Sequence, residues 1–125
     1  MMNDKRPKHL DLRLIKLPLP GYVSILHRIS GALLFMSLPL LLWAFQYSLK
    51  SIETFTLLSG MLQQPFSKLL IIFVLWAFLH HLCAGIRYLA IDMDLGVSRA
   101  RAHASSKWVL AVSLALTVLL GVRLW

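Results

Sequence analysis

The sequence predicts an all-α integral membrane protein with three transmembrane helices and a basic N-terminal arm at the membrane interface. Hydrophobic residues make up 58% of the 125 residues and charged residues only 14%, a balance that suits lipid better than water. Residues 30–49, 69–91 and 108–125 form apolar stretches, and each is near the roughly 20 residues that a helix needs to cross a bilayer. Because backbone polar groups are not left unpaired in hydrocarbon, each span is expected to be helical.

The arm, residues 1–21, alternates leucines with charged side chains and ends in a Pro-Leu-Pro-Gly run. Its leucines are expected to dip into the headgroup boundary while its cations meet anionic lipid. The two prolines interrupt a regular helix, so the first span is expected to begin at about Tyr22.

The spans are predicted at about 22–49, 68–91 and 108–125, within a single membrane domain covering residues 1–125. Pro39 removes a backbone hydrogen bond and is expected to kink the first span near Phe35. Polar connectors follow the first and second spans. Three helices make an incomplete bundle, so partner helices in a larger heteromeric bundle are expected.

The net charge of +8 lies at the membrane edges rather than on a surface where basic and aromatic residues are interleaved. This arrangement argues against nucleic acid as a partner and points to membrane lipid. The positive-inside rule places the N-terminus and the second connector in the cytoplasm. The single cysteine, Cys83, excludes an internal disulfide and an iron-sulfur cluster built from this chain, since a cluster needs about four thiolates.

Two adjacent histidines, His80 and His81, lie about ten residues, or roughly 15 Å, from the end of the second span. Ionisable side chains at that depth are functional by default. A neutral imidazole there can ligate haem iron, relay a proton or simply hydrogen-bond a neighbouring helix. Gly85 shares a helical face with His81 and leaves room for a flat macrocycle or another helix, whereas His80 points about 100° away, towards an interhelical contact.

Arg87 lies six residues beyond His81 towards the cytoplasm, deep enough that a charged guanidinium needs a partner or a snorkelling route to the interface. A haem propionate is one such partner. A salt bridge with Asp92 or a lipid phosphate is the equally simple alternative.

A second polar group stands at the cytoplasmic mouth of the first span: Ser24, His27, Arg28, Ser30 and Gly31. Ser24 and Arg28 share a face, and a hydroxyl and a guanidinium together can hold the carbonyl of a quinone. The alternative is that Arg28 merely follows the positive-inside rule. His27 is expected at the membrane edge, too far from His81 in depth for both to ligate one iron, so a second ligand is expected from another subunit.

The sequence resembles the cytochrome b556 membrane anchor subunits of succinate dehydrogenase, respiratory complex II, along almost its whole length. Two motifs carry the resemblance. The first runs from Arg6-Pro7 and Leu10-Asp11-Leu12 to Ser24-Ile25-Leu26-His27-Arg28-Ile29-Ser30-Gly31, and the second is His81-Leu82-Cys83-Ala84-Gly85-Ile86-Arg87 followed by Asp92.

The resemblance implies that His81 is one axial ligand of the iron of haem b, shared with a second small membrane anchor subunit. It also implies that Ser24 and Arg28 line the ubiquinone site and that His27 and Arg28 approach the haem propionates. A flavoprotein and an iron-sulfur subunit would dock on the cytoplasmic side of the bacterial inner membrane.

On this interpretation the chain anchors the complex and transfers electrons, and it is not catalytic by itself. His27 is also a candidate for delivering protons to the quinone. A fumarate reductase anchor, a haem-free proton transporter and a purely structural anchor stand as alternatives.

Overall fold

The computed structural model describes residues 16–125, which form four helices: α1 (Leu19–Ser48), α2 (Ile52–Leu62), α3 (Pro65–Asp92) and α4 (Arg99–Leu124). Three of them, α1, α3 and α4, are long and apolar enough to cross a membrane. The predicted fold class is therefore confirmed, and the chain is an all-α multi-pass membrane protein. Residues 1–15 of the predicted arm lie outside the described part.

The first helix begins at Leu19, so the prediction of a start at Tyr22 was wrong. Pro18 is the residue before the first turn and Pro20 lies within that turn. Proline is tolerated there because the first N–H groups of a helix have no intrahelical partner to lose. At the other end α1 continues through Pro39 as one assigned helix to Ser48.

The connector after the first span contains a short helix, α2, where the sequence predicts only a polar linker. The Ser51 hydroxyl accepts a hydrogen bond from the Thr54 N–H at 3.2 Å, and the Thr54 hydroxyl accepts one from the Ser51 N–H at 3.0 Å. This reciprocal capping satisfies two donors at the start of the helix. Hydrogen bonding to the Ser51 side chain lowers the pKa of the Glu53 carboxyl, which keeps it anionic beside the positive end of α2.

The last helix begins at Arg99, well before the predicted residue 108. Ser98 caps it by accepting a hydrogen bond from the Arg101 N–H at 3.4 Å. The turn leading into it contains two residues with left-handed backbone, Asp94 (φ 60°) and Gly96 (φ 76°). α4 therefore starts within the predicted polar connector. Its first turns contain the basic residues of that connector, and the apolar span follows them in the same helix.

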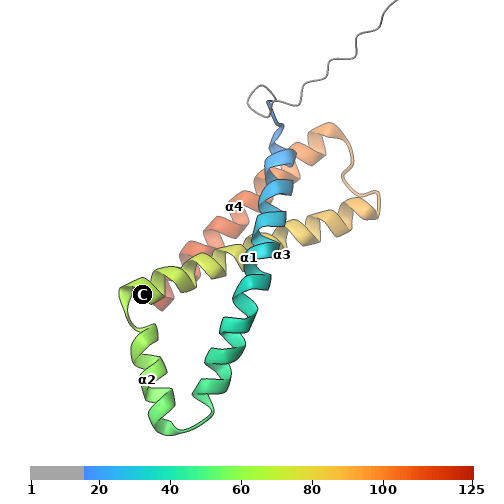
Figure 1. Ribbon diagram of the computed structural model, residues 1–125. Helices are drawn as coiled ribbons and strands as arrows, with labels where there is room; N and C mark the ends of the chain where they lie inside the picture. Colours follow the sequence, from blue (N-terminus) through green and yellow to red (C-terminus); the bar gives the residue numbers. More distant parts are fainter. Residues whose placement is uncertain (1–15) are drawn as a thin grey trace, which may run out of the picture.

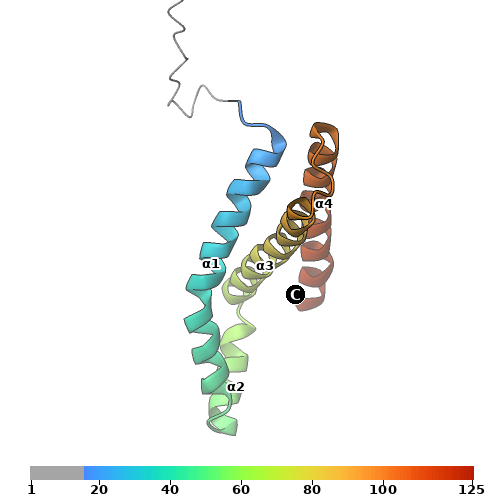
Figure 2. The ribbon, with the colours of Figure 1, turned by 90° about the vertical axis from the view of Figure 1, so that its right-hand side faces the viewer.

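The central helix is α3, which packs extensively against both α1 and α4, whereas α1 and α4 touch each other less. Figure 1 shows α1 crossing α3 and α2 closing a triangle with them, and Figure 2 shows α1 and α4 on opposite sides of α3. A small core forms where the three long helices meet, around Val23, Ala84 and Val109. Large apolar side chains elsewhere on the long helices are exposed, which agrees with lipid or partner helices covering them.

The contact between α3 and α4 is built from small residues. The buried residues of α4 recur every three or four positions: Ser106, Val109, Ser113, Thr117 and Gly121. A Cβ added to Gly121 would lie 3.6 Å from the Ile72 side chain. Small side chains at this spacing allow helices to approach closely where there is no water to drive their association.

Candidate functional site

His81 lies where α1 crosses α3, and its ring is held by groups of α1. Its Nδ1 lies 3.1 Å from the His27 carbonyl oxygen and 3.3 Å from the Ser30 hydroxyl. A carbonyl can only accept, so Nδ1 carries the proton in the bond to His27. Nε2 makes no hydrogen bond within residues 16–125 and is left with its lone pair, which is the form that a metal-ligating imidazole adopts.

The side chain of His27 stacks on the ring of His81. The ring centroids are 4.2 Å apart and the planes differ by 15°. The expectation that the two histidines lie at different membrane depths was therefore wrong. His27 stands about 12 Å along α1 from its start at Leu19, because the helix begins eight residues before it.

The stacked arrangement nevertheless keeps the two histidines from ligating opposite faces of one haem. Two axial ligands have the flat macrocycle between them, and two rings in face-to-face contact leave no space for it. Beyond this pair, no group of three His, Cys, Asp or Glu side chains suited to a metal ion occurs in the described residues. At this crossing the two rings can therefore supply one ligand to a haem, and Nε2 of His81 is the candidate because Nδ1 is held by α1.

Glycines on both helices make the crossing close. Gly85 of α3 faces His27 of α1, whose Nε2 would lie 3.7 Å from an added Cβ. Of the two neighbours expected at this glycine, a flat macrocycle or another helix, the structure therefore shows a helix. Gly31 of α1 faces His81, whose Cε1 would lie 2.9 Å from an added Cβ. The sequence placed Ser30 and Gly31 in the group around Arg28, and only the helix crossing reveals that both contact His81.

His80 differs from its neighbour because its side chain is fully buried. Its ring stacks on Trp76 with centroids 5.7 Å apart. Neither ring nitrogen has a hydrogen-bond partner in the described part of the chain. Full burial keeps His80 from reaching a group bound between this chain and a partner, whereas His81 is partly exposed.

Ser24 and Arg28 are joined as their spacing predicts. The Arg28 Nη2 donates to the Ser24 hydroxyl at 3.2 Å. On α1, Arg28 is exposed and follows His27 directly, and Ser24 is partly exposed about one turn before Arg28. The pair therefore presents a hydroxyl and a cation to whatever covers this face.

Arg87 is buried between α3 and α4, with 8% of its surface exposed. Its Nε donates to the Ser105 hydroxyl at 2.9 Å and its Nη2 to the Ala102 carbonyl at 3.4 Å, and the guanidinium lies 5.3 Å from the Tyr88 ring centre. Of the alternatives for Arg87, a salt bridge with Asp92 is therefore not formed among the described residues. Both acceptors are neutral oxygens, so the bonds satisfy donors without neutralising the charge.

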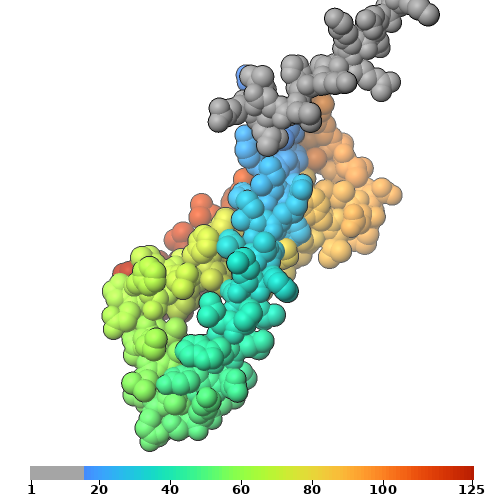
Figure 3. All heavy atoms as spheres, in the orientation of Figure 1, coloured from blue at the N-terminus to red at the C-terminus, as the bar shows by residue number. Residues whose placement is uncertain are grey.

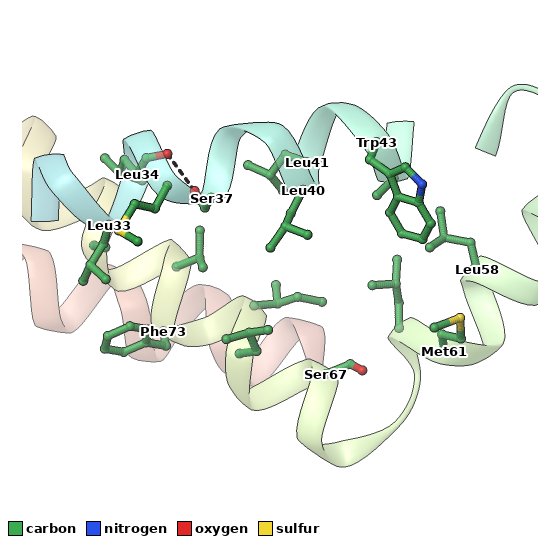
Figure 4. A pocket seen from close by; sticks show the side chains of 17 residues that line it. Leu33, Leu34, Ser37, Leu40, Leu41, Trp43, Leu58, Met61, Ser67 and Phe73 are labelled. Carbon is green, nitrogen blue, oxygen red and sulfur yellow. Dashed lines mark hydrogen bonds between the residues drawn. The ribbon is translucent and has the colours of Figure 1, made fainter. Parts of the chain in front are cut away.

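An apolar pocket of about 580 Å³ lies between α1, α2 and α3, on the α2 side of the point where α1 crosses α3. Figure 3 shows the hollow from outside, and Figure 4 shows side chains such as Leu40, Trp43, Leu58 and Phe73 around it. The hydroxyl of Ser37 in its wall donates to the Leu34 carbonyl of its own helix at 2.8 Å. None of the lining side chains is titratable, so the pocket itself is apolar.

Comparisons with known protein families and with individual proteins point to the same family. The model of the family described as "Succinate dehydrogenase/Fumarate reductase transmembrane subunit" matches residues 2–120. The "Succinate dehydrogenase cytochrome b556 subunit" of Coxiella burnetii is 39% identical over 99% of this chain and 100% of its own length. The proteins of the same name from Paracoccus denitrificans (31% identity, 91% of this chain and 88% of the relative) and Rickettsia bellii (33%, 95% and 93%) are also similar.

Proposed function

The chain belongs to the family of succinate dehydrogenase and fumarate reductase transmembrane subunits, and from this premise we propose that it is the cytochrome b membrane anchor of a succinate dehydrogenase. In this role His81 would hold the iron of haem b, and the chain would contribute part of the quinone site. The observation that carries the proposal is the bond from Nδ1 of His81 to the His27 carbonyl, at 3.1 Å, which leaves Nε2 for iron. The b-type haem supplies one-electron redox chemistry when it is bound.

Three cationic or titratable side chains are candidates to hold the propionates of a haem. The ring of His27 stacks on that of His81, and Arg28 is the next residue of α1 after His27. Arg87 lies six residues after His81 on α3. The neutral acceptors of Arg87 leave its positive charge for an anion, and a propionate is such an anion. A second ligand would come from another small membrane subunit, because the stack of His27 on His81 leaves no space for a haem between these two rings.

The quinone site uses Ser24 and Arg28. Their hydrogen bond at 3.2 Å shows that both polar ends reach the same point, where a quinone carbonyl accepts from the hydroxyl and the guanidinium. The partners are then a flavoprotein and an iron-sulfur subunit on the cytoplasmic side of a bacterial inner membrane. The relatives carry the succinate dehydrogenase name, which favours succinate oxidation over fumarate reduction as the physiological direction.

The haem assignment is tested by reduced-minus-oxidised optical spectra of the purified complex with His81→Leu, and with His80→Leu as the matched neighbour. The b-type band should disappear in the first variant and persist in the second. A full band in His81→Leu would refute His81 as ligand, whereas a wild-type complex without any b-type band would favour a haem-free transporter or structural anchor.

The quinone assignment is tested with Ser24→Ala and Arg28→Gln. The KM for quinone should rise about tenfold in Arg28→Gln, because a hydrogen bond to a charged group contributes about 1.5–3 kcal/mol. Rates are normalised to succinate oxidation with a soluble electron acceptor, which bypasses the membrane site. An unchanged KM in both variants would place the quinone elsewhere.

A role of His27 in delivering protons to the quinone belongs to the same proposal. The ring of His27 lies next to Arg28 along α1 and against His81, so it stands between the quinone pair and the haem ligand. Replacing it with a side chain that does not titrate should change the pH profile of quinone reduction. An identical profile in His27→Gln would exclude this role.

A further inference from the structure

Two histidine–glycine pairs face each other where α1 crosses α3. In α1, Gly31 lies one turn after His27, and in α3, Gly85 lies one turn after His81. The ring of His81 lies over Gly31, and the ring of His27 lies over Gly85. Because the two helices run in opposite directions, each helix offers a histidine to the other helix's glycine, and the two rings meet in a stack between them.

The two glycines do not provide equal space. A Cβ on Gly85 would lie 3.7 Å from His27 Nε2, an ordinary van der Waals contact. A Cβ on Gly31 would lie 2.9 Å from Cε1 and 3.3 Å from Nδ1 of His81, and real Cβ atoms almost never approach so closely. A methyl group at position 31 therefore has to displace the imidazole of His81.

The imidazole has little freedom to be displaced. One face is covered by His27 at 4.2 Å, and Nδ1 is held by the His27 carbonyl and the Ser30 hydroxyl. These groups belong to the same turn of α1 as Gly31, so any shift that relieves the methyl contact also disturbs the stack or the Nδ1 bond. The direction of Nε2 follows from all three contacts, since the imidazole is rigid.

We propose that Gly31 is a positioning residue for His81, and that its lack of a side chain sets the direction in which Nε2 meets the haem iron. This inference rests on the proposed ligand role of His81. Orienting contacts of metal ligands commonly change metal affinity 10–100-fold when they are lost. Gly31→Ala should accordingly lower haem retention about tenfold, or shift the haem's midpoint potential and low-spin paramagnetic resonance signal where haem is retained.

The experiment compares complete complexes carrying Gly31→Ala, Gly121→Ala and His81→Ala. Gly121 is the matched control because it is a buried helix glycine whose added Cβ would meet Ile72 at an ordinary 3.6 Å. Haem content, midpoint potential and resonance signal are measured per succinate-oxidising unit. Gly121→Ala should match the wild type in all three, and Gly31→Ala should not. Equal values in Gly31→Ala and wild type would overturn the inference.

The third variant separates this inference from the proposed function. Full haem in His81→Ala refutes the proposed ligand, whereas loss in His81→Ala with an unchanged Gly31→Ala refutes only the positioning role. If Gly31→Ala fails to assemble, the same change is placed in a His81→Gly background, where the ring that it contacts is absent. Assembly equal to that of His81→Gly alone supports the inference, and a persisting defect overturns it.

Discussion

At the scale of single residues, His80 and His81 show how the same side chain takes opposite environments one position apart. His81 is partly exposed and donates through Nδ1 to α1, whereas His80 is fully buried with both nitrogens unpartnered. A buried polar group without a partner costs about 1–3 kcal/mol. The two histidines should therefore respond differently to the same substitution.

We expect His80→Leu to leave the free energy of unfolding unchanged or to raise it by about 1–2 kcal/mol, because it removes an unsatisfied polar ring and keeps an apolar side chain against Trp76. Equilibrium unfolding of the chain in detergent with a chaotropic surfactant measures this. A clear destabilisation would show that His80 has a polar partner inside the folded chain.

At the scale of helices, apolar length predicts the three spans, and helix periodicity correctly predicts the Ser24–Arg28 contact. Local pattern does not predict the stacking of His27 on His81, since that depends on where two distant helices cross. The starts of α1 and α4 were also misplaced: Pro20 was interpreted as a barrier although the first turn tolerates proline, and the cap at Ser98 lies outside the apolar stretch. The Ser51–Thr54 pair similarly marks α2 within a segment interpreted as a linker.

The bond between Arg87 and Ser105 joins α3 to α4. Ser105→Ala should lower the free energy of unfolding by about 1–3 kcal/mol, because it leaves a buried guanidinium N–H without its acceptor. Ser106→Ala is the control, as the Ser106 hydroxyl donates to the Ala102 carbonyl within α4 at 2.8 Å. Detergent unfolding curves should separate the two variants, and equal stability would contradict the role of this bond.

At the scale of the whole molecule, the three long helices form an open assembly rather than a closed bundle. The core around Val23, Ala84 and Val109 is small, and many large apolar side chains on the outer faces remain exposed. This surface agrees with a subunit that shares its membrane region with partner helices and lipid. The Ser24–Arg28 pair lies near the start of α1, and the apolar pocket lies further along, between α1, α2 and α3.

The proposed orientation puts the start of α1, with Ser24 and Arg28, on the cytoplasmic side. In a Cys83→Ala background, Ser59→Cys in α2 and Val97→Cys before α4 introduce exposed thiols at opposite ends. A membrane-impermeant thiol reagent applied to spheroplasts should label position 59 at once and position 97 only after permeabilisation, since basic connectors are retained in the cytoplasm. The reverse pattern would invert the topology and move the haem and quinone groups to the outer side.

The most direct test of the central claim is chemical rescue of His81→Gly by imidazole in the complete complex. We predict that the variant lacks the b-type band in a reduced-minus-oxidised spectrum, and that added imidazole restores it by occupying the space and the coordination position that the side chain leaves. A band that is present without imidazole, with the same midpoint potential as the wild type, would show that His81 is not the ligand.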